Sequence, residues 1–177
     1  MPAPPATPDI CTLLEDLARA RHEADHDDLT GLLNRRGLRR RLSLAEMPTQ
    51  GTLVFCDVDG LKKINAAKGH AAGDAAIQKA ATALRSCLRP GDLLARWGGD
   101  EFLAILCDSS PTRRQGPPAE ADALAQRFKD RLEAILPASQ PVRLSLGLTH
   151  GPLAAFTDLL EQADAQIRLV RQTGKRP

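Results

Sequence analysis

This sequence has few aromatic residues and little excess of either charge. Phe, Trp and Tyr together make up 3% of the 177 residues, and Tyr is absent. Proteins that stack nucleic-acid bases use platforms of aromatic rings, which this composition does not favour. The formal net charge is only +2, so composition gives no sign of the basic surface of a nucleic-acid-binding protein. We therefore expect no nucleic-acid partner.

Long apolar runs and paired cysteines are missing as well. No stretch approaches the roughly 18 apolar residues of a membrane span, and the opening MPAPPATPDI lacks the charged and apolar segments of a signal peptide. The four cysteines form no CxxC pair, which disfavours a zinc knuckle or a thioredoxin-type site. Cys56 and Cys107 lie inside apolar runs, as small buried residues do. These features favour a reducing, cytoplasmic setting without a membrane span.

The chain length suits one domain preceded by a short appendage, at roughly 150 residues per domain. Residues 1–26 are expected to form a disordered, Pro-rich lead and a linker helix, and residues 27–177 the domain. In the linker, apolar residues recur at helical spacing at Ile10, Leu13, Leu14 and Leu17. Two interpretations of this helix stay open. It packs on its own domain, or it is one half of a two-stranded coil that pairs two subunits.

Short apolar runs alternate with longer amphipathic stretches along the domain. Runs bounded by Gly, Pro or Asp predict strands, and apolar residues every three or four positions predict helices. Strands are predicted over residues 52–58, 93–97, 102–106 and 142–149, and helices over residues 36–45, 61–67, 71–88, 120–136 and 157–171. The two middle strands flank Gly98-Gly99, which is typical of a β-hairpin. This order predicts an α+β sandwich with helices over a mostly antiparallel sheet.

Two acidic clusters follow a strand end and a turn. Asp57-Val58-Asp59 ends the first predicted strand, and Asp100-Glu101 follows the Gly98-Gly99 turn. Taken singly, each cluster is compatible with ordinary solvated turn residues. If the hairpin pairs beside the first strand, however, the clusters converge at one edge of the sheet, where their charges repel unless a cation lies between them. Carboxylates are hard ligands and favour Mg²⁺ or Mn²⁺.

The same pattern indicates a phosphate-bearing ligand. Mg²⁺ held by few carboxylates commonly carries nucleotide phosphates, and a pair of metal ions can hold both the attacking and the leaving oxygen. Gly98 and Gly99 have no side chains, so a bulky ligand can lie against the hairpin backbone. The residues therefore indicate metal-dependent chemistry on a nucleoside triphosphate, beside the alternative of ordinary turn acids.

The segment RWGGDEF, residues 96–102, resembles the signature of the GGDEF domain, the diguanylate cyclase family. Other segments resemble the family in the same order: DDLTGLLNRRG (27–37), DVDGLKKIN (57–65), KGHAAGD (68–74), RLSLG (143–147) and QAD (162–164). The resemblance implies a palm-like (nucleotidyl cyclase/ferredoxin-like) sandwich. It also implies a signalling enzyme that joins two GTP molecules into cyclic di-GMP with release of pyrophosphate. Two subunits would face each other as a homodimer, so that each 3′-hydroxyl attacks the α-phosphate of the other GTP.

The resemblance also assigns roles to individual residues. The implied ligands of Mg²⁺ or Mn²⁺ are Asp57, Val58 through its main-chain carbonyl, Asp100 and Glu101. The implied catalytic residues are Asp100, which takes the 3′-hydroxyl proton, Glu101, and Lys62, which stabilises phosphate charge. The implied substrate-binding residues are Asn65, Asp74, His70, Gly98, Gly99, Arg171 and Lys175. Among these, Asn65 and Asp74 would recognise guanine.

A further implied site lies at Arg89 and Asp92, which match the RxxD product-inhibition site of the family, five residues before the Gly-Gly turn. The alternative interpretation is an ordinary helix stop at Pro90-Gly91.

Arg171 and Lys175 depart from the family, which has a lysine and an arginine at these places, so charge is kept but hydrogen-bond geometry is not. Two rivals to the enzyme therefore stay open. One is a catalytically weak domain that binds GTP or cyclic di-GMP for regulation. The other is a regulatory partner that uses only the N-terminal helix and the basic face of the next helix.

Overall fold

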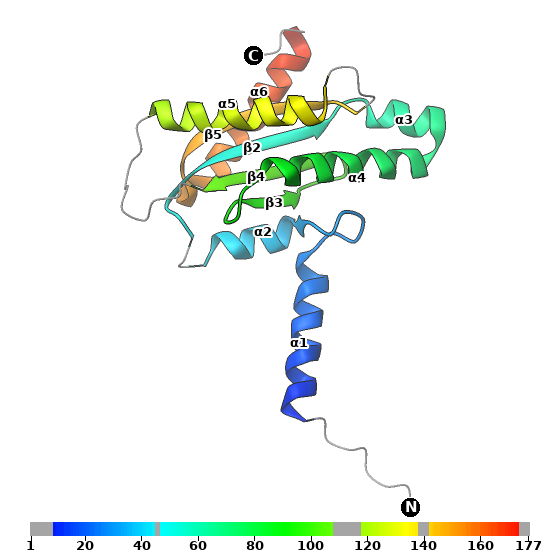
Figure 1. Cartoon of the computed structure of the whole chain (residues 1–177), viewed down its shortest axis with the longest axis vertical. Coiled ribbons are helices and arrows are strands. Elements are labelled where there is room, and N and C mark those ends of the chain that lie inside the picture. Colours follow the sequence, from blue (N-terminus) through cyan, green and yellow to red (C-terminus); the bar gives the residue numbers. More distant parts are fainter. Residues whose placement is uncertain (1–8, 45–46, 108–117, 138–141, 174–177) are drawn as a thin grey trace, which may run out of the picture.

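The computed structural model describes residues 9–44, 47–107, 118–137 and 142–173, without the side chains of residues 118–121 and 173. The helices are α1 (Ile10–Asp25), α2 (Arg35–Leu42), α3 (Leu61–Lys68), α4 (His70–Cys87), α5 (Pro118–Ile135), the short η1 (Leu153–Ala155) and α6 (Phe156–Thr173). The strands are β1 (Leu33–Asn34), β2 (Gln50–Val58), β3 (Leu93–Arg96), β4 (Glu101–Cys107) and β5 (Leu144–Pro152) (Figure 1). No described helix is long and apolar enough to cross a membrane.

A five-stranded sheet in the order β1-β3-β4-β2-β5 forms the centre of the domain. β1 pairs with β3 in parallel, and the other neighbouring strands are antiparallel. The side chains of β2 alternate between two cores, with Val54 and Cys56 on one face and Leu53 and Phe55 on the other. The predicted α+β class with a mostly antiparallel sheet flanked by helices is confirmed.

Each face of the sheet is covered by two helices. α4 and α5 cover one face, and α2 and α6 cover the other (Figure 1). Most buried residues of α4 are small, and they are Gly73, Ala76, Ala80, Ala81, Ala83 and Cys87, beside the larger Ile77 and Leu84. Small buried side chains let a helix approach its neighbour closely. α4 also contacts α3, where Gly73 lies against the side chain of Asn65.

Two predicted boundaries differ from the structure by three residues, the others differ by less, and one short strand was not predicted. The last strand continues to Pro152 rather than ending near residue 149, because its pairing with β2 extends to Gln50. The helix predicted to reach residue 45 ends at Leu42, where Ser43 caps it. Leu33–Asn34 form β1, which the sequence did not predict because two residues show no period.

The N-terminal helix α1 points away from the sheet (Figure 1). Its apolar stripe is exposed, at 75% for Ile10, 52% for Leu13, 59% for Leu14 and 46% for Leu17. The only buried residue of α1 is its last, Asp25. The interpretation that this helix packs on its own domain is therefore wrong, because the stripe finds no partner within the described chain. Residues 1–8, for which the sequence predicts a disordered lead, lie outside the described residues.

Several arginines of α2 contact other parts of the chain rather than solvent alone. Arg40 pairs with Asp25, which is 4% exposed at the end of α1. The guanidinium groups of Arg35 and Arg39 lie 4.5 and 5.5 Å from the ring centroid of Trp97, within the range of cation–π attraction. Helix α2 therefore connects the end of α1 to the residue that precedes the Gly-Gly turn.

Candidate functional site

The two acidic clusters meet at the end of β2. Asp57 of β2 lies directly opposite Glu101 of β4 in the antiparallel ladder. The ladder continues past the strand, since the main-chain N–H of Val58 donates to the carbonyl of Asp100 at 2.9 Å. The convergence that the sequence predicted therefore follows from the register of two central strands.

Burial and repulsion between like charges dominate the electrostatics of this edge. Asp57 is 8% exposed. Burial raises the pKa of its carboxyl group, Arg171 lowers it, and the charges of Asp100 and Asp59 raise it further. Burial likewise raises the pKa of Glu101, and neighbouring carboxylates add to that rise. These oxygens are a chemically suitable donor set for Mg²⁺ or Mn²⁺, because such a cation would offset the repulsion.

The side chains as they lie do not yet enclose a cation. Among the described residues, no three acidic, His or Cys side chains are arranged to hold a metal ion. Two of these carboxylates have contacts within the chain. Arg171 donates to Asp57 Oδ1, and the Glu101 carboxylate lies against Gly98, where an added Cβ would be 2.4 Å from Glu101 Oε2. The donors therefore fit the cation by type, while Arg171 and Gly98 adjoin two of them in this structure.

The two glycines of the turn have different surroundings. Gly98 accommodates Glu101, whereas an added Cβ at Gly99 would meet nothing within 4 Å. The sequence suggested that both glycines make room for a ligand. In the structure only Gly99 faces open space, because the bend of the turn brings Glu101 back over Gly98.

Arg96 fixes the position of the turn. Its Nη2 and Nε donate to the carbonyl of Gly99 at 2.7 and 3.3 Å. Its Nη1 lies 3.1 and 3.3 Å from the two carboxylate oxygens of Asp27. The same Asp27 carboxylate accepts from the N–H and the hydroxyl of Thr30 at 2.9 and 2.6 Å. The turn is thus attached through one guanidinium group to the loop that follows α1.

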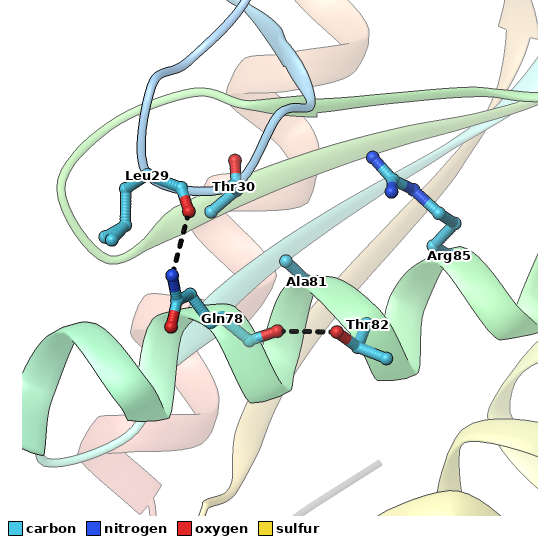
Figure 2. Close-up of a pocket in the computed structure, with 6 residues that line it drawn as sticks. All are labelled: Leu29, Thr30, Gln78, Ala81, Thr82 and Arg85. Atoms are coloured by element: carbon cyan, nitrogen blue, oxygen red, sulfur yellow. Dashed lines mark hydrogen bonds between the residues drawn. The ribbon is translucent and has the colours of Figure 1, made fainter.

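That loop rests on α4 around a cavity of about 250 Å³. Figure 2 shows its lining residues, which are Leu29, Thr30, Gln78, Ala81, Thr82 and Arg85. Gln78 donates to the carbonyl of Leu29 at 3.2 Å, as the dashed line in Figure 2 shows. Arg85 reaches the carbonyl of Gly31 at 3.5 Å. These contacts support the Asp27 loop from the α4 side.

A second candidate binding feature lies between α3 and α4. Asn65 Oδ1 is buried and has no hydrogen-bond partner among the described residues. Its side chain lies against Gly73, where an added Cβ would be 1.9 Å from Oδ1. Asp74 follows Gly73 and is exposed. A buried acceptor without a partner is costly, so this oxygen is suited to an N–H group of a ligand.

The other residues expected around a nucleotide are less constrained. Lys62 and His70 are exposed on α3 and at the start of α4. Arg171, expected on phosphate, contacts Asp57 instead and lies 3.8 Å from Asp59 Oδ1. Lys175 lies outside the described residues.

Arg89 and Asp92 form a closed turn at the other end of β3. The Asp92 carboxylate accepts from the main-chain N–H groups of Arg89 and Cys107 at 3.1 and 3.0 Å. The Arg89 guanidinium donates to the carbonyl of Cys107 and lies 3.5 Å from Asp92 Oδ1. Both residues line two neighbouring grooves of about 480 and 470 Å³. The run therefore ends a helix and also presents an arginine to open grooves.

The decisive comparison is with protein families. Residues 24–177 match the family described as diguanylate cyclase, GGDEF domain. The chain belongs to the GGDEF family. The match spans the whole acidic edge, the Asn65 region and the Arg89 turn of this GGDEF domain, and it confirms the family that the motifs suggested.

Curated relatives of this GGDEF domain include enzymes of both synthesis and breakdown. Diguanylate cyclase TpbB of Pseudomonas aeruginosa is 39% identical over 142 residues, which are 77% of this chain and 30% of TpbB. Cyclic di-GMP phosphodiesterase PdeB of Shewanella oneidensis is 34% identical over 151 residues, which are 80% of this chain and 16% of PdeB. The chain thus spans less than a third of the length of either relative.

A solved structure shows the same fold. The coiled coil and GGDEF domain of DgcB from Caulobacter crescentus, in complex with c-di-GMP, matches with a TM-score of 0.76 at 24% identity. The match covers 94% of this chain and 90% of that chain. At this identity the likeness concerns the fold, and it extends over the helix that precedes the GGDEF domain.

Sequence reasoning missed three residues that shape the site of this GGDEF domain. It gave no role to Asp27 or Arg96, although both lie in the segments that resemble the family, because their contact joins positions 69 residues apart. It also missed Gly73, which leaves room for the Asn65 side chain. A glycine inside a helix is a weak signal by itself, but it commonly has a packing reason.

Proposed function

We propose that this GGDEF domain is a diguanylate cyclase that condenses two GTP molecules into cyclic di-GMP and releases pyrophosphate. The observation that carries the proposal is the meeting of Asp57, Asp100 and Glu101 at one sheet edge, beside the open Gly99 turn. In-line displacement at phosphorus needs mainly positioning and neutralisation of charge. An edge that gathers carboxylates next to exposed backbone supplies the place for both.

The proposed metal ligands are the carboxylates of Asp57, Asp100 and Glu101 and the carbonyl of Val58. A bound Mg²⁺ or Mn²⁺ supplies neutralisation of the phosphate charge. Asp100 holds the proton that leaves the 3′-hydroxyl. Three side-chain cations stabilise the triphosphate, and they are Lys62 of α3, Arg171 of α6 and Lys175.

Guanine recognition is proposed for Asn65 and Asp74. The unpartnered Asn65 oxygen and the adjacent carboxylate are both acceptors. Guanine presents an N1–H and an exocyclic amine on one edge, whereas adenine presents an acceptor at the corresponding ring nitrogen. GTP is therefore preferred over ATP, because a mismatch leaves buried acceptors unpaired.

Catalysis is proposed to need two copies of the chain, each holding one GTP. The exposed apolar stripe of α1 supports this arrangement, because pairing of two such helices would bury Leu13, Leu14 and Leu17.

Product inhibition is proposed at Arg89 and Asp92. The two grooves beside Arg89 offer room for cyclic di-GMP, and a guanidinium fork suits its phosphates. A second arginine lies nearby, since Arg131 of α5 donates to the carbonyl of Ser86 at 2.9 Å, three residues before Arg89. Arg127 of α5 instead donates to the carbonyl of Ala123 on its own helix.

The second candidate function is a regulatory module that binds GTP or cyclic di-GMP without turning over GTP. The observation that favours it is the contact of Arg171 with Asp57, which occupies an oxygen of the proposed metal ligand.

Replacement of Asp100 distinguishes the two functions. Purified protein with GTP and Mg²⁺ should form cyclic di-GMP, and Asp100→Ala should lose about 100-fold or more of that rate, the effect of about 3 kcal/mol on the barrier. Asp122→Ala, which removes an exposed carboxylate of α5, is the matched control and should keep the rate. Replacing GTP by ATP should give little product. A wild-type protein that binds GTP but forms no product would establish the regulatory module instead.

A further inference from the structure

Arg171 of α6 contacts two acidic residues at the end of β2. Its Nη2 donates to Asp57 Oδ1 and lies 3.8 Å from Asp59 Oδ1. Asp59 is itself held in place, because Ser145 donates to its Oδ1 at 2.6 Å and its main-chain N–H donates to the carbonyl of Arg143 at 2.9 Å. Both carboxylates therefore face the same guanidinium group.

The contact with two carboxylates depends on the shape and the several donors of an arginine side chain. A guanidinium group is planar and carries several donors, so it can address two carboxylates at once, whereas the ammonium group of lysine is a single compact charge. Arg171 also lies where a positive charge is most needed, since Asp57 is nearly buried among other carboxylates. Its own side chain is 47% exposed, so it can leave Asp57 for solvent without disturbing the core.

We propose that Arg171 is an internal counter-ion that competes with the divalent cation for the Asp57 carboxylate and is released to the triphosphate when cation and nucleotide bind together. The proposal rests on the proposed function, because it takes Asp57 as a metal ligand. Arg171 and a metal ion held by the same nearly buried carboxylate would be two positive charges a few ångströms apart, and they would repel each other. Binding of the cation alone therefore displaces Arg171 without compensation. The cation with GTP compensates, since the phosphates give the freed guanidinium a new partner.

This mechanism makes the bare cation a poor ligand and the cation–GTP pair a good one. Arg171 would then offset the negative charge of the Asp57 carboxylate until the cation and GTP bind together. Removal of Arg171 should separate the two effects, because the cation gains access to Asp57 while the triphosphate loses a binding partner.

The test measures Mn²⁺ binding to nucleotide-free protein, by electron paramagnetic resonance of free Mn²⁺. Arg171→Ala should bind Mn²⁺ about tenfold more tightly than wild type, the ratio expected when a partly exposed charged contact is removed. Arg168→Ala is the matched control, because Arg168 lies one turn earlier on α6 and pairs with Asp164 instead. Its Mn²⁺ affinity should equal that of wild type. Arg171→Gln, which keeps a polar side chain without the charge, should behave as Arg171→Ala does.

A complementary titration uses GTP with a non-reactive α,β-linkage in the presence of Mn²⁺, where Arg171→Ala should bind more weakly than wild type. Equal Mn²⁺ affinities of wild type and Arg171→Ala, both abolished by Asp57→Asn, would overturn the counter-ion while leaving the metal site intact. Mn²⁺ binding that Asp57→Asn does not weaken in either background would overturn the metal assignment in the proposed function, and the counter-ion with it.

Discussion

Replacement of Asp27 by Ala should destabilise the domain and slow its chemistry together. The carboxylate accepts from Arg96 and from two donors of Thr30. Its side chain is 21% exposed and that of Arg96 is 16% exposed, so the pair lies between the surface and the core. Surface pairs contribute up to about 1 kcal/mol, and breaking a buried pair costs about 3–5 kcal/mol. We therefore expect a loss of about 2 kcal/mol in the free energy of unfolding.

The assay is urea denaturation followed by circular dichroism. With a slope of about 2 kcal/mol per molar urea, the midpoint of Asp27→Ala should fall by about 1 M. Asp28→Ala is the control, because Asp28 is the exposed neighbour on the same loop, and its midpoint should stay close to that of wild type. Turnover of GTP should fall in Asp27→Ala as well, because Arg96 then holds the Gly99 carbonyl without its own anchor.

A double-mutant cycle separates the ion pair from the other contacts of Asp27. If Asp27→Ala and Arg96→Ala interact through this pair, their combined effect should be smaller than the sum of the single effects by about 1 kcal/mol or more. Strict additivity, or equal midpoints of Asp27→Ala and Asp28→Ala, would refute the role given to the pair.

Three further replacements test other parts of the site. Gly73→Ala should raise the KM for GTP with a small effect on folding, because the new Cβ displaces the Asn65 side chain; an unchanged KM in steady-state assays would argue against guanine recognition there. The raised pKa of Glu101 means that the folded state holds this proton more tightly than the unfolded state. The protonated carboxyl group of Glu101 therefore stabilises the fold at low pH, and this stabilisation is lost as pH rises through the raised pKa. In metal-free urea titrations, Glu101→Gln should be more stable than wild type at neutral pH but not at low pH. Arg89→Ala should keep turnover but bind cyclic di-GMP at least about tenfold more weakly by calorimetry, since a charged contact contributes about 1.5–3 kcal/mol; equal affinities would leave the run as a helix stop only.

The sequence predicted the elements with strong local patterns, and it predicted the convergence of the acidic clusters on the condition that the hairpin pairs beside the first strand. The apolar run that became β2 and the hairpin around Gly98-Gly99 were recognisable because burial on both faces and a turn pair leave clear local signals. The meeting of Asp57 with Glu101 followed from pairing these two elements.

Contacts between distant side chains could not be predicted in this way. Arg171 and Asp57 are 114 residues apart, and nothing in the local pattern of α6 indicates which residue its last turn faces. The exposure of α1 was also undetermined, because an apolar stripe at helical spacing looks the same whether it packs on its own domain or on a partner. Such contacts depend on how the elements pack.

The most direct test of the proposed activity is the mass balance of the reaction with purified protein, GTP and Mg²⁺. Chromatography should show two GTP consumed and two pyrophosphate released for each cyclic di-GMP formed. Turnover per chain should rise with protein concentration, because two GTP-loaded copies must meet. Consumption of GTP to GDP and phosphate, or no consumption at all at high protein concentration, would contradict the assignment of a diguanylate cyclase.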